Sequence, residues 1–492
     1  MVLSLIAIVT IINYLDRGTL NYMWVANTKH VVAADAYTYD EQTACYHFEL
    51  DGVALSVPQA QVAVQADGSL EYTEYGGIAK DLGLIDLSAS QEQQQRQAKG
   101  MLAVITTFFM IAYGISQLVS GKIYDKIGTR KGFTLSALLW GGADALASLA
   151  SGLKSLTFFR VMLGLGEAGP WPGTTKSNAE WFPQKERALA QGIFGGAASM
   201  GSIVAPILIP ALFLAFGWRI TFVIVGMLGV LWVLPWLIIN KKGPKEHPWI
   251  TPEEREYILS GQPESKVTND AGKSWKTLLG EKKNYAVILG RFFLDPIWWM
   301  FVTWLPIYLI EVFNLDIKQI AMSAWVPYVG AAIGSIAGGW FSGLLINRGK
   351  SVNFARKTAI IAGSCVIVPS MILAAMAQSA MVAVVLMAFI LGGFQFVMTN
   401  IQTLVSDFQT GKAVGSLAGL GGAAAVLGTL VATWLIPILT QSGNWTSFFV
   451  LGASLVPLCL LAIFLCGGRI EQVGNAKNKK ENLINHLFSN IT

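Results

Sequence analysis

Charged residues are scarce in this chain of 492 residues, since Asp, Glu, Lys and Arg together make up 13% of it, whereas a soluble globular protein carries about 25%. Cysteine and histidine are scarcer, with four of each. Three of the cysteines lie in apolar runs and only Cys45 lies in a polar segment, so no disulfide framework is predicted. The sequence also has no phosphate-binding loop, metal-ligand spacing or nucleophilic triad. We therefore expect no enzyme activity, no metal and no cofactor.

Hydrophobic residues, by contrast, make up 53% of the chain. They form runs of about twenty residues, the length that an α-helix needs to cross the hydrocarbon core of a bilayer. The fold class is therefore predicted to be an all-α polytopic membrane protein. Twelve membrane-spanning helices are expected, near 1–21, 100–119, 132–151, 154–175, 188–216, 220–239, 285–312, 320–346, 358–376, 381–404, 414–439 and 447–465.

The twelve spans divide the chain into two sets of six. We expect a first half at 1–240, a polar connector at 241–284, a second half at 285–468 and a polar tail at 469–492. In the connector, Thr251 and Pro252 predict the cap and first residue of a short helix. The first span has no basic start and no small-residue cleavage site, so we expect it to be retained rather than cleaved as a signal peptide.

The loops between spans give the orientation, because cytoplasmic loops are rich in Lys and Arg. The net charge of +5 thus reflects topology rather than nucleic-acid binding. We expect both termini in the cytoplasm and, for a bacterial protein, a place in the inner membrane. The basic loops carry Lys122, Lys126, Arg130 and Lys131; Lys176, Lys185 and Arg187; and Arg348, Lys350, Arg356 and Lys357.

The segment at about 28–77 interrupts this regular pattern between the first and second spans. It is polar and strongly acidic, and parts of it alternate between apolar and polar residues, which predicts a small β-hairpin structure. It is too short for an independent enzyme domain. We expect an elaborated external loop.

Two charged residues lie inside the apolar, glycine-rich run of the fourth span. Arg160 and Glu167 are seven residues apart, which places them on one face of one helix. A charge at the centre of a bilayer costs roughly 2.5–3.5 kcal/mol on insertion scales, so charges retained there indicate a function. The alternative is an ion pair that only holds helices together.

The motif from Gly121 to Lys131, Gly-Lys-Ile-Tyr-Asp-Lys-Ile-Gly-Thr-Arg-Lys, resembles the signature between spans two and three of the major facilitator superfamily. A weaker copy begins at Gly339 and has Gly343 where the signature has its acid. The resemblance implies two pseudo-symmetric six-helix halves around a midplane cavity. It also implies a cytoplasmic gate network of Gly121, Asp125, Arg130 and Arg187.

Further motifs are similar to the anion:cation symporter family within that superfamily, and to its hexuronate transporters in particular. They include Tyr14-Leu-Asp16-Arg17, Tyr113, Arg160 with Glu167, Glu180-Trp-Phe-Pro183, Phe293-Leu-Asp295-Pro-Ile-Trp298-Trp299 and Thr399-Asn400. The inserted segment at 28–77 has no counterpart in these relatives. The resemblance implies proton-coupled import of a sugar-acid anion such as glucuronate or galacturonate.

A sugar acid brings one carboxylate and several hydroxyl groups. The family resemblance assigns the carboxylate to Arg17, and arginine suits this role because its planar fork binds carboxylates bidentately. Arg160 is either a second carboxylate ligand or a partner that tunes nearby acids. Tyr113, Asn400 and Gln395 are candidates for binding the hydroxyl groups or the carboxylate, with helix cross-linking as the alternative for Asn400 and Gln395. Trp298, Trp299 and Trp304 are candidates for stacking on the sugar, although tryptophan is also common at membrane interfaces.

Proton coupling requires acids that change charge during transport. Asp16 and Glu167 are the candidates, because burial and a nearby arginine act on them in opposite directions. Importing a monovalent anion against 100 mV costs about 2.3 kcal/mol, so one proton makes the step electroneutral and a second lets the potential drive it. Asp295 precedes Pro296, which suggests a structural or gating role, and Asp144 has no assignment. The second half is expected to supply neutral and aromatic groups but no comparable charge pair.

The expected partners are therefore an organic anion, protons and the lipid bilayer, with no nucleic acid, and the protein is expected to be a monomer. Two alternatives remain at this point. The substrate could be another organic anion, such as an aldonate, an aldarate or sialic acid, or the coupling ion could be sodium. Alternatively the protein could be a membrane sensor that transports nothing, although a sensor has no need of titrating acids in a cavity.

Overall fold

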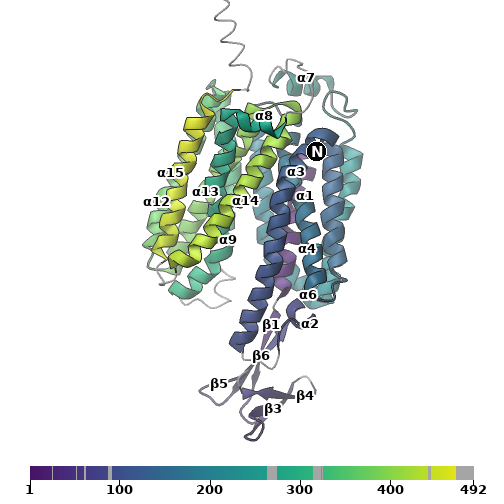
Figure 1. The fold of residues 1–492 in the computed structure, drawn as a ribbon, viewed down its shortest axis with the longest axis vertical. Helices are drawn as coiled ribbons and strands as arrows, with labels where there is room; N and C mark the ends of the chain where they lie inside the picture. The colour runs from purple at the N-terminus through teal and green to yellow at the C-terminus, as the bar shows by residue number, and fades with distance from the viewer. Residues whose placement is uncertain are drawn as a thin grey trace, which may run out of the picture.

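A computed structural model of the chain describes residues 1–24, 26–50, 52–59, 62–86, 91–262, 274–313, 323, 325–440 and 445–471. The protein is a bundle of long helices with a small β-structure projecting from one end (Figure 1). The opposite end carries the N-terminus and the helices α7 (Pro252–Ser260) and α8 (Trp275–Gly280). We call these two ends of the bundle the insertion end and the connector end.

Ten stretches of helix within the described residues are long and apolar enough to cross a membrane. One of them, Gly100–Ala147, is broken at Gly128 and so supplies two spans. The short helices α4 (Leu153–Glu167) and α5 (Pro170–Trp181) follow each other directly and supply one more. Together these make the twelve spans that the apolar runs predict.

The first half contains α1 (Val2–Trp24), α3 (Gln91–Ala147), α4, α5 and α6 (Arg187–Ile239). Two of its reversals are shorter than the sequence suggests. The helix of span two continues past residue 119 as far as Gly128, whose φ of 81° breaks α3, and Gly217 with φ of 76° breaks α6 in the same way. Glycine adopts this left-handed conformation without steric cost.

The second half contains six helices: α9 (Tyr285–Phe313), α11 (Val326–Asn347), α12 (Val352–Ala375), α13 (Ala380–Phe408), α14 (Val414–Thr440) and α15 (Thr446–Gly467). The start of the span expected at 320–346 lies partly outside the described residues. Ser351 and Ser379 cap α12 and α13 by accepting bonds from backbone N–H groups three residues on.

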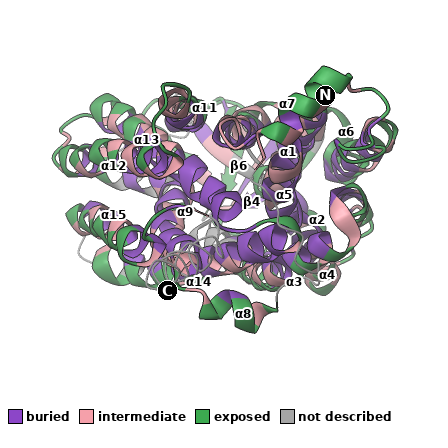
Figure 2. Cartoon of the chain, turned by 90° about the horizontal axis from the view of Figure 1, so that it is seen from above, coloured by how far each residue is buried: buried purple, intermediate pink, exposed green. Residues whose placement is uncertain are grey.

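Each half has its own hydrophobic core. Buried side chains from Ala286 to Ile470 form one cluster, and those of the first half form two others. The halves meet where α6 packs on α11 and α3 packs on α14. Viewed along the bundle, α12, α13 and α15 lie on one side, α4 and α6 on the other, and buried faces turn inward (Figure 2). The halves are therefore two bodies that share an interface rather than a core.

The first helix of the connector is α7, which starts at Pro252 after Thr251, as predicted; the Thr251 side chain accepts a bond from the backbone N–H of Glu254. Its contacts are with the first half. The Tyr257 hydroxyl donates to Glu186, and Gln262 donates to the backbone oxygen of Glu180 at 2.7 Å. The 3-10 helix η2 (Lys282–Asn284) then leads into α9.

The insertion between α1 and the short helix α2 (Ile78–Asp81) forms two three-stranded antiparallel sheets, in agreement with the predicted β-structure. One sheet has the order β1-β6-β5 and the other β2-β3-β4. A small core of Val32, Tyr46, Phe48, Val57 and Leu70 lies between them. The strands are β1 (Ala26–Val32), β2 (Tyr37–Asp40), β3 (Cys45–Leu50), β4 (Val53–Pro58), β5 (Val62–Val64) and β6 (Leu70–Gly76).

The first and last strands of the insertion pair with each other, with Ala26 opposite Gly76. The insertion therefore leaves the helices and returns to them at one point. Two of its turns hold acids in the charged form. Bonds from Thr43 and the backbone N–H of Gln42 lower the pKa of Asp40, and bonds from the side chain and backbone of Ser69 lower that of Asp67.

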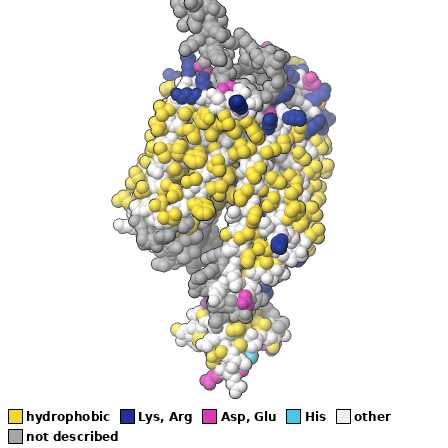
Figure 3. All heavy atoms as spheres, viewed as in Figure 1, with side chains coloured by type: hydrophobic (Ala, Val, Ile, Leu, Met, Phe, Trp, Pro, Cys, Tyr) yellow, Lys and Arg dark blue, Asp and Glu magenta, His cyan; other side chains and the backbone are white. Residues whose placement is uncertain are grey.

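The outer surface of the helices is hydrophobic between the two ends, and dark-blue Lys and Arg side chains gather at the connector end (Figure 3). An apolar belt bounded by basic residues on one side is the surface of a multi-pass membrane protein.

Candidate functional site

Two cavities lie between the halves, within the bundle. The larger has a volume of about 420 Å³ and is lined by α1, α3, α4, α6, α9 and α11. It extends from Tyr14 and Arg17 to Asn21 and Tyr22, toward the insertion end of α1. The smaller, of about 60 Å³, shares Tyr14, Arg17, Trp298 and Trp299 with the first and is lined also by α13 and α14. Small-molecule sites typically have volumes of roughly 300–1,000 Å³.

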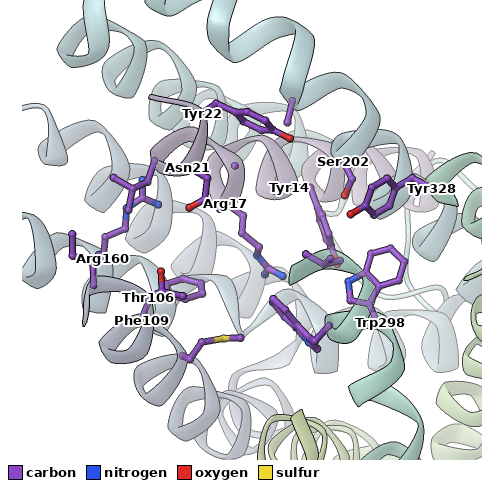
Figure 4. Close-up of a pocket in the computed structure, with 17 residues that line it drawn as sticks. Tyr14, Arg17, Asn21, Tyr22, Thr106, Phe109, Arg160, Ser202, Trp298 and Tyr328 are labelled. Carbon is purple, nitrogen blue, oxygen red and sulfur yellow. The ribbon is translucent and has the colours of Figure 1, made fainter. Parts of the chain in front are cut away.

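Arg17 stands at the junction of the two cavities. Figure 4 shows it between Arg160 on one side and Tyr14 and Trp298 on the other. Its guanidinium carbon lies 4.9 Å from the Tyr14 ring centroid and 5.2 Å from that of Tyr113, within the range of cation–π contacts. The Arg17 side chain keeps 17% of its surface exposed, so it is the charged group of this region best placed to meet a ligand.

Glu167 contacts Arg17 and, unlike Arg17, lines neither of the two cavities. Arg17 Nε donates to Glu167 Oε2 at 3.1 Å, and Glu167 is fully buried at the end of α4. The bond joins α1 to α4. Asp16, which immediately precedes Arg17 on α1, is also fully buried, and neither of its oxygens has a hydrogen-bond partner among the described residues. Among the described residues that line these two cavities, neither acid is found, so protein lies between each predicted coupling acid and the cavities.

Arg160 pairs with Asp144 of α3, at 3.9 Å between Arg160 Nη2 and Asp144 Oδ1. The sequence places Arg160 and Glu167 on one helix face, but in the structure each has its closest opposite charge on another helix. Asp144, which had no assignment, therefore belongs to the charged cluster. Arg160 also lines the larger cavity.

Together Asp16, Asp144 and Glu167 face Arg17 and Arg160 inside the first half. Asp16, Asp144, Glu167 and Arg160 are each at most 4% exposed. If every group is ionised, the cluster has one negative charge more than it has positive charges. A buried, unbalanced charge is costly in a membrane. Binding of one proton to one of the three acids would make the cluster neutral and remove this cost.

The neutral candidate residues of the second half fall into two groups: some line a cavity and others do not. Gln395 and Trp298 line the smaller cavity, and Trp298 is held by Phe394, with ring centroids 5.8 Å apart and stacked. Asn400 is fully buried, and its amide donates to the backbone oxygens of Gly338 and Phe396, both at 3.0 Å. In this geometry Asn400 links α13 to α11, the alternative considered above, and a contact of Asn400 with a ligand stays a prediction. Trp304 lines neither of the two cavities and packs against the hydrophobic core of the second half.

The expectation that the second half has no comparable charge pair is wrong. Arg291 and Asp295 line the smaller cavity from α9 and form an ion pair at 3.1 Å. They are four residues apart, so they face each other across one helical turn. This spacing of opposite charges within an apolar span was the sequence signal that could have revealed the pair.

The connector end of the interface is held closed by Asp125. Its carboxylate accepts from the backbone N–H groups of Gly415 and Ser416, at 3.0 and 2.6 Å, at the start of α14. Lys176 donates to the same carboxylate at 3.0 Å and to the backbone oxygen of Gly411 at 3.1 Å. Lys176 therefore takes part in this contact between the halves, which the motif did not indicate. The helix N-terminus is a favourable partner for the acid because of its free N–H groups.

Arg187, which the family motif suggests for the gate network, donates to Ser406 O at 2.9 Å across the interface and to backbone oxygens of its own half. Beside it Arg356, fully buried, binds Asp407 at 2.9 Å and Gln184 O at 3.1 Å. Arg130, expected in the same network, instead donates to Leu237 O at the surface of the first half.

Gly121 lets the halves approach at this end. A Cβ atom at Gly121 would lie 2.2 Å from the backbone oxygen of Gly415, and one at Gly339 would lie 2.2 Å from that of Ala188. Gln191 and Gln402, which line the smaller cavity, bond to each other across the interface. The cavities are thus closed toward the connector end.

Comparison with known proteins gives a consistent family. A sequence model of the Major Facilitator Superfamily matches residues 6–420. The hexuronate transporter of Escherichia coli K12 is 31% identical over 351 residues, which are 70% of this chain and 80% of that protein. The galacturonate transporter of Dickeya chrysanthemi is 32% identical over 281 residues, 56% of this chain and 81% of that protein. A probable galactarate/D-glucarate transporter of Escherichia coli K12 is 28% identical over 409 residues, which are 79% of this chain and 91% of that protein.

Solved structures agree on the fold. The proton:xylose symporter XylE superposes with a TM-score of 0.62 at 13% identity, covering 96% of each chain. The fucose:proton symporter of Escherichia coli gives a TM-score of 0.58 at 15% identity, covering 75% of this chain and 92% of that one.

Proposed function

This chain belongs to the major facilitator superfamily, and we propose that it imports a sugar-acid anion, a hexuronate such as glucuronate or galacturonate, together with protons by alternating access. The relatives named for hexuronate and galacturonate support the substrate class. The observation that carries the proposal is the Arg17–Glu167 ion pair, in which the arginine lines both cavities and the acid lies buried behind it.

This arrangement couples substrate to proton through competition for one arginine. A carboxylate that binds Arg17 bidentately takes the donors that now neutralise Glu167. Glu167 then becomes an uncompensated buried charge and binds a proton instead. The substrate adds a negative charge to a cluster that already has one in excess, so two protons, on Glu167 and on Asp16 or Asp144, restore neutrality. Two protons per monovalent anion also let the membrane potential drive import.

Alternating access is supported by the separate cores of the two halves and by the position of their contacts. The contacts that would have to break are those of Asp125, Lys176 and Arg187 with the second half. In the described state these are intact, while the larger cavity extends toward the insertion end. We assign the connector end to the cytoplasm, because Lys and Arg gather there (Figure 3), and place the protein in a bacterial inner membrane.

Reconstitution of the purified protein in liposomes containing the pH-sensitive dye pyranine tests this function. Adding glucuronate or galacturonate outside is expected to acidify the lumen. Glu167→Gln is expected to abolish concentrative uptake but to retain counterflow exchange, because exchange requires no net proton movement. Glu246→Gln, which removes an exposed acid of the connector, is the matched control and should behave as the wild type.

Three results would contradict the proposal. Equal loss of uptake and exchange in Glu167→Gln would remove that residue from coupling. Uptake driven by a sodium gradient without lumen acidification would replace the proton by sodium. No transport of any organic anion would favour a sensor instead.

A further inference from the structure

The Arg291–Asp295 pair poses a question that anion transport by itself does not answer. A cavity that accepts an anion has no evident need of an aspartate in its wall. Yet Asp295 lines the smaller cavity, opposite Arg17 and Tyr113 of the first half, and its side chain is 15% exposed. A purely structural pair would be expected to face other protein groups rather than a cavity.

The geometry of the pair leaves Asp295 as an acceptor. Arg291 Nε donates to Asp295 Oδ2 at 3.3 Å and Arg291 Nη2 to Oδ1 at 3.1 Å. Each carboxylate oxygen can accept a further bond. Arg291 itself is 9% exposed in its side chain and packs toward α14, where a Cβ at Gly421 would lie 3.2 Å from its Cδ. Of the two groups, Asp295 is therefore turned more toward the cavity.

The residues around Asp295 are of the kinds that bind a polyhydroxylated ligand. Trp298 and Trp299 follow it by three and four residues on α9, so all three share one helix face. Both tryptophans line both cavities. A flat aromatic ring packs on the C–H face of a sugar, while a neighbouring carboxylate accepts its hydroxyl donors.

We propose that Asp295 is the hydroxyl-binding end of the site and that it selects sugar acids with one carboxylate over aldarates, which have a carboxylate at each end. The inference rests on the proposed function. A monocarboxylate that binds Arg17 presents hydroxyl groups to Asp295, whereas an aldarate presents a second carboxylate, which has no proton to donate and is repelled by Asp295. A site built to bond hydroxyl groups rejects analogues that leave its polar atoms unpaired.

Competition experiments on the wild-type protein give the first test. Unlabelled galacturonate is expected to inhibit uptake of labelled galacturonate at least about tenfold more strongly than galactarate does, a difference of about 1.4 kcal/mol. Equal inhibition by the two compounds would overturn the inference and leave the proposed function intact.

The variant Asp295→Asn gives the second test, because it removes the charge and keeps one acceptor. In this variant, the inhibitory potency of galactarate relative to that of galacturonate is expected to rise at least about tenfold. An unchanged ratio would overturn the inference. Glu246→Gln, which removes an acid from an exposed pair with the same four-residue spacing, should leave the ratio unchanged.

Ligand-induced thermal stabilisation of the detergent-solubilised protein separates this inference from the proposed function. Stronger stabilisation by galacturonate than by galactarate in the wild type, lost in Asp295→Asn, supports the selectivity even if no transport is seen. Equal stabilisation by both compounds contradicts it even if transport is proton-coupled.

Discussion

Around the two cavities, the halves of the molecule place their charges in different ways, although a fully buried pair away from the cavities, Arg356 with Asp407, joins two helices of the second half as well. In the first half, arginines and acids meet across helices: Arg17 of α1 with Glu167 of α4, and Arg160 of α4 with Asp144 of α3. In the second half, the pair that lines the cavity lies within α9. Partners on different helices can separate when the helices or a ligand move, whereas partners one turn apart stay together. The first half is therefore suited to change its charge state, and the second half to recognise a ligand without changing its own.

Replacing the cavity arginines by lysine tests this difference most strongly. Lysine keeps the charge but loses the planar fork. Arg17→Lys is expected to lower the initial rate of uptake at low substrate concentration on the order of 100-fold, because it loses both the substrate fork and the bond to Glu167. Arg291→Lys should lower it about tenfold or less. Similar losses in both variants would break the comparison.

Removing the acid of the second interhelical pair is expected to affect stability rather than selectivity. Asp144→Asn leaves Arg160 without its partner and should destabilise the protein by about 3 kcal/mol, seen as a lower melting temperature in detergent. Asp144→Asn combined with Arg160→Gln should recover part of the loss, because no uncompensated charge remains. If the double variant is less stable than the single one, the pair is not the source of the effect.

The glycines at the connector end provide a case in which the halves should behave alike. Gly121→Ala and Gly339→Ala each place a methyl group against a backbone oxygen of the other half. Both are expected to shift the population toward separation at this end. Spin labels on Lys126→Cys and Lys350→Cys, in a background without the four native cysteines, would report a longer distance by electron paramagnetic resonance. A shift in only one variant would show that the gate opens asymmetrically.

Deleting the β insertion, which lies in the first half between α1 and α2, is expected to have the smallest effect. Asn27 and Tyr75 are opposite each other in the strand register, and such partners lie about 4.5–5.5 Å apart. Residues 28–74 can therefore be replaced by two glycines. Uptake should change by less than about twofold, because no buried group of the bundle is exposed. A larger loss would give the insertion a part in transport.

Most of the fold could be predicted from the sequence, since long apolar runs and basic loops impose a helical membrane protein. The reversals could not be located as well. The charged residues around Gly128 suggest a loop, but the helix continues to that glycine because nothing before it prevents helical geometry. The closed connector end was also beyond the sequence, since it depends on Asp125 reaching backbone groups of α14 rather than another side chain.

Site residues could be predicted where a motif identified them. They could not be predicted where the orientation of a helix decides which side chain faces the cavity. Arg17 and Trp298, which the motifs single out, line both cavities, and Glu167 is bonded to Arg17. Gln395 and Asn400 are five residues apart on α13, about 140° around the helix, so only one of them can face the cavity, and the sequence alone does not say which. The partners of Arg160 and Glu167 depend on how α1, α3 and α4 pack, which no spacing within one helix reveals.

The paired strands that close the insertion also have a practical consequence. A transporter whose helices end at the membrane surface offers few features by which images of single particles can be oriented in electron microscopy. Here a β-structure with its own core projects beyond the helices on one side (Figure 1). Because β1 joins it to α1 and β6 joins it to α2, the insertion stays at one end of the bundle and would identify that end in each particle image.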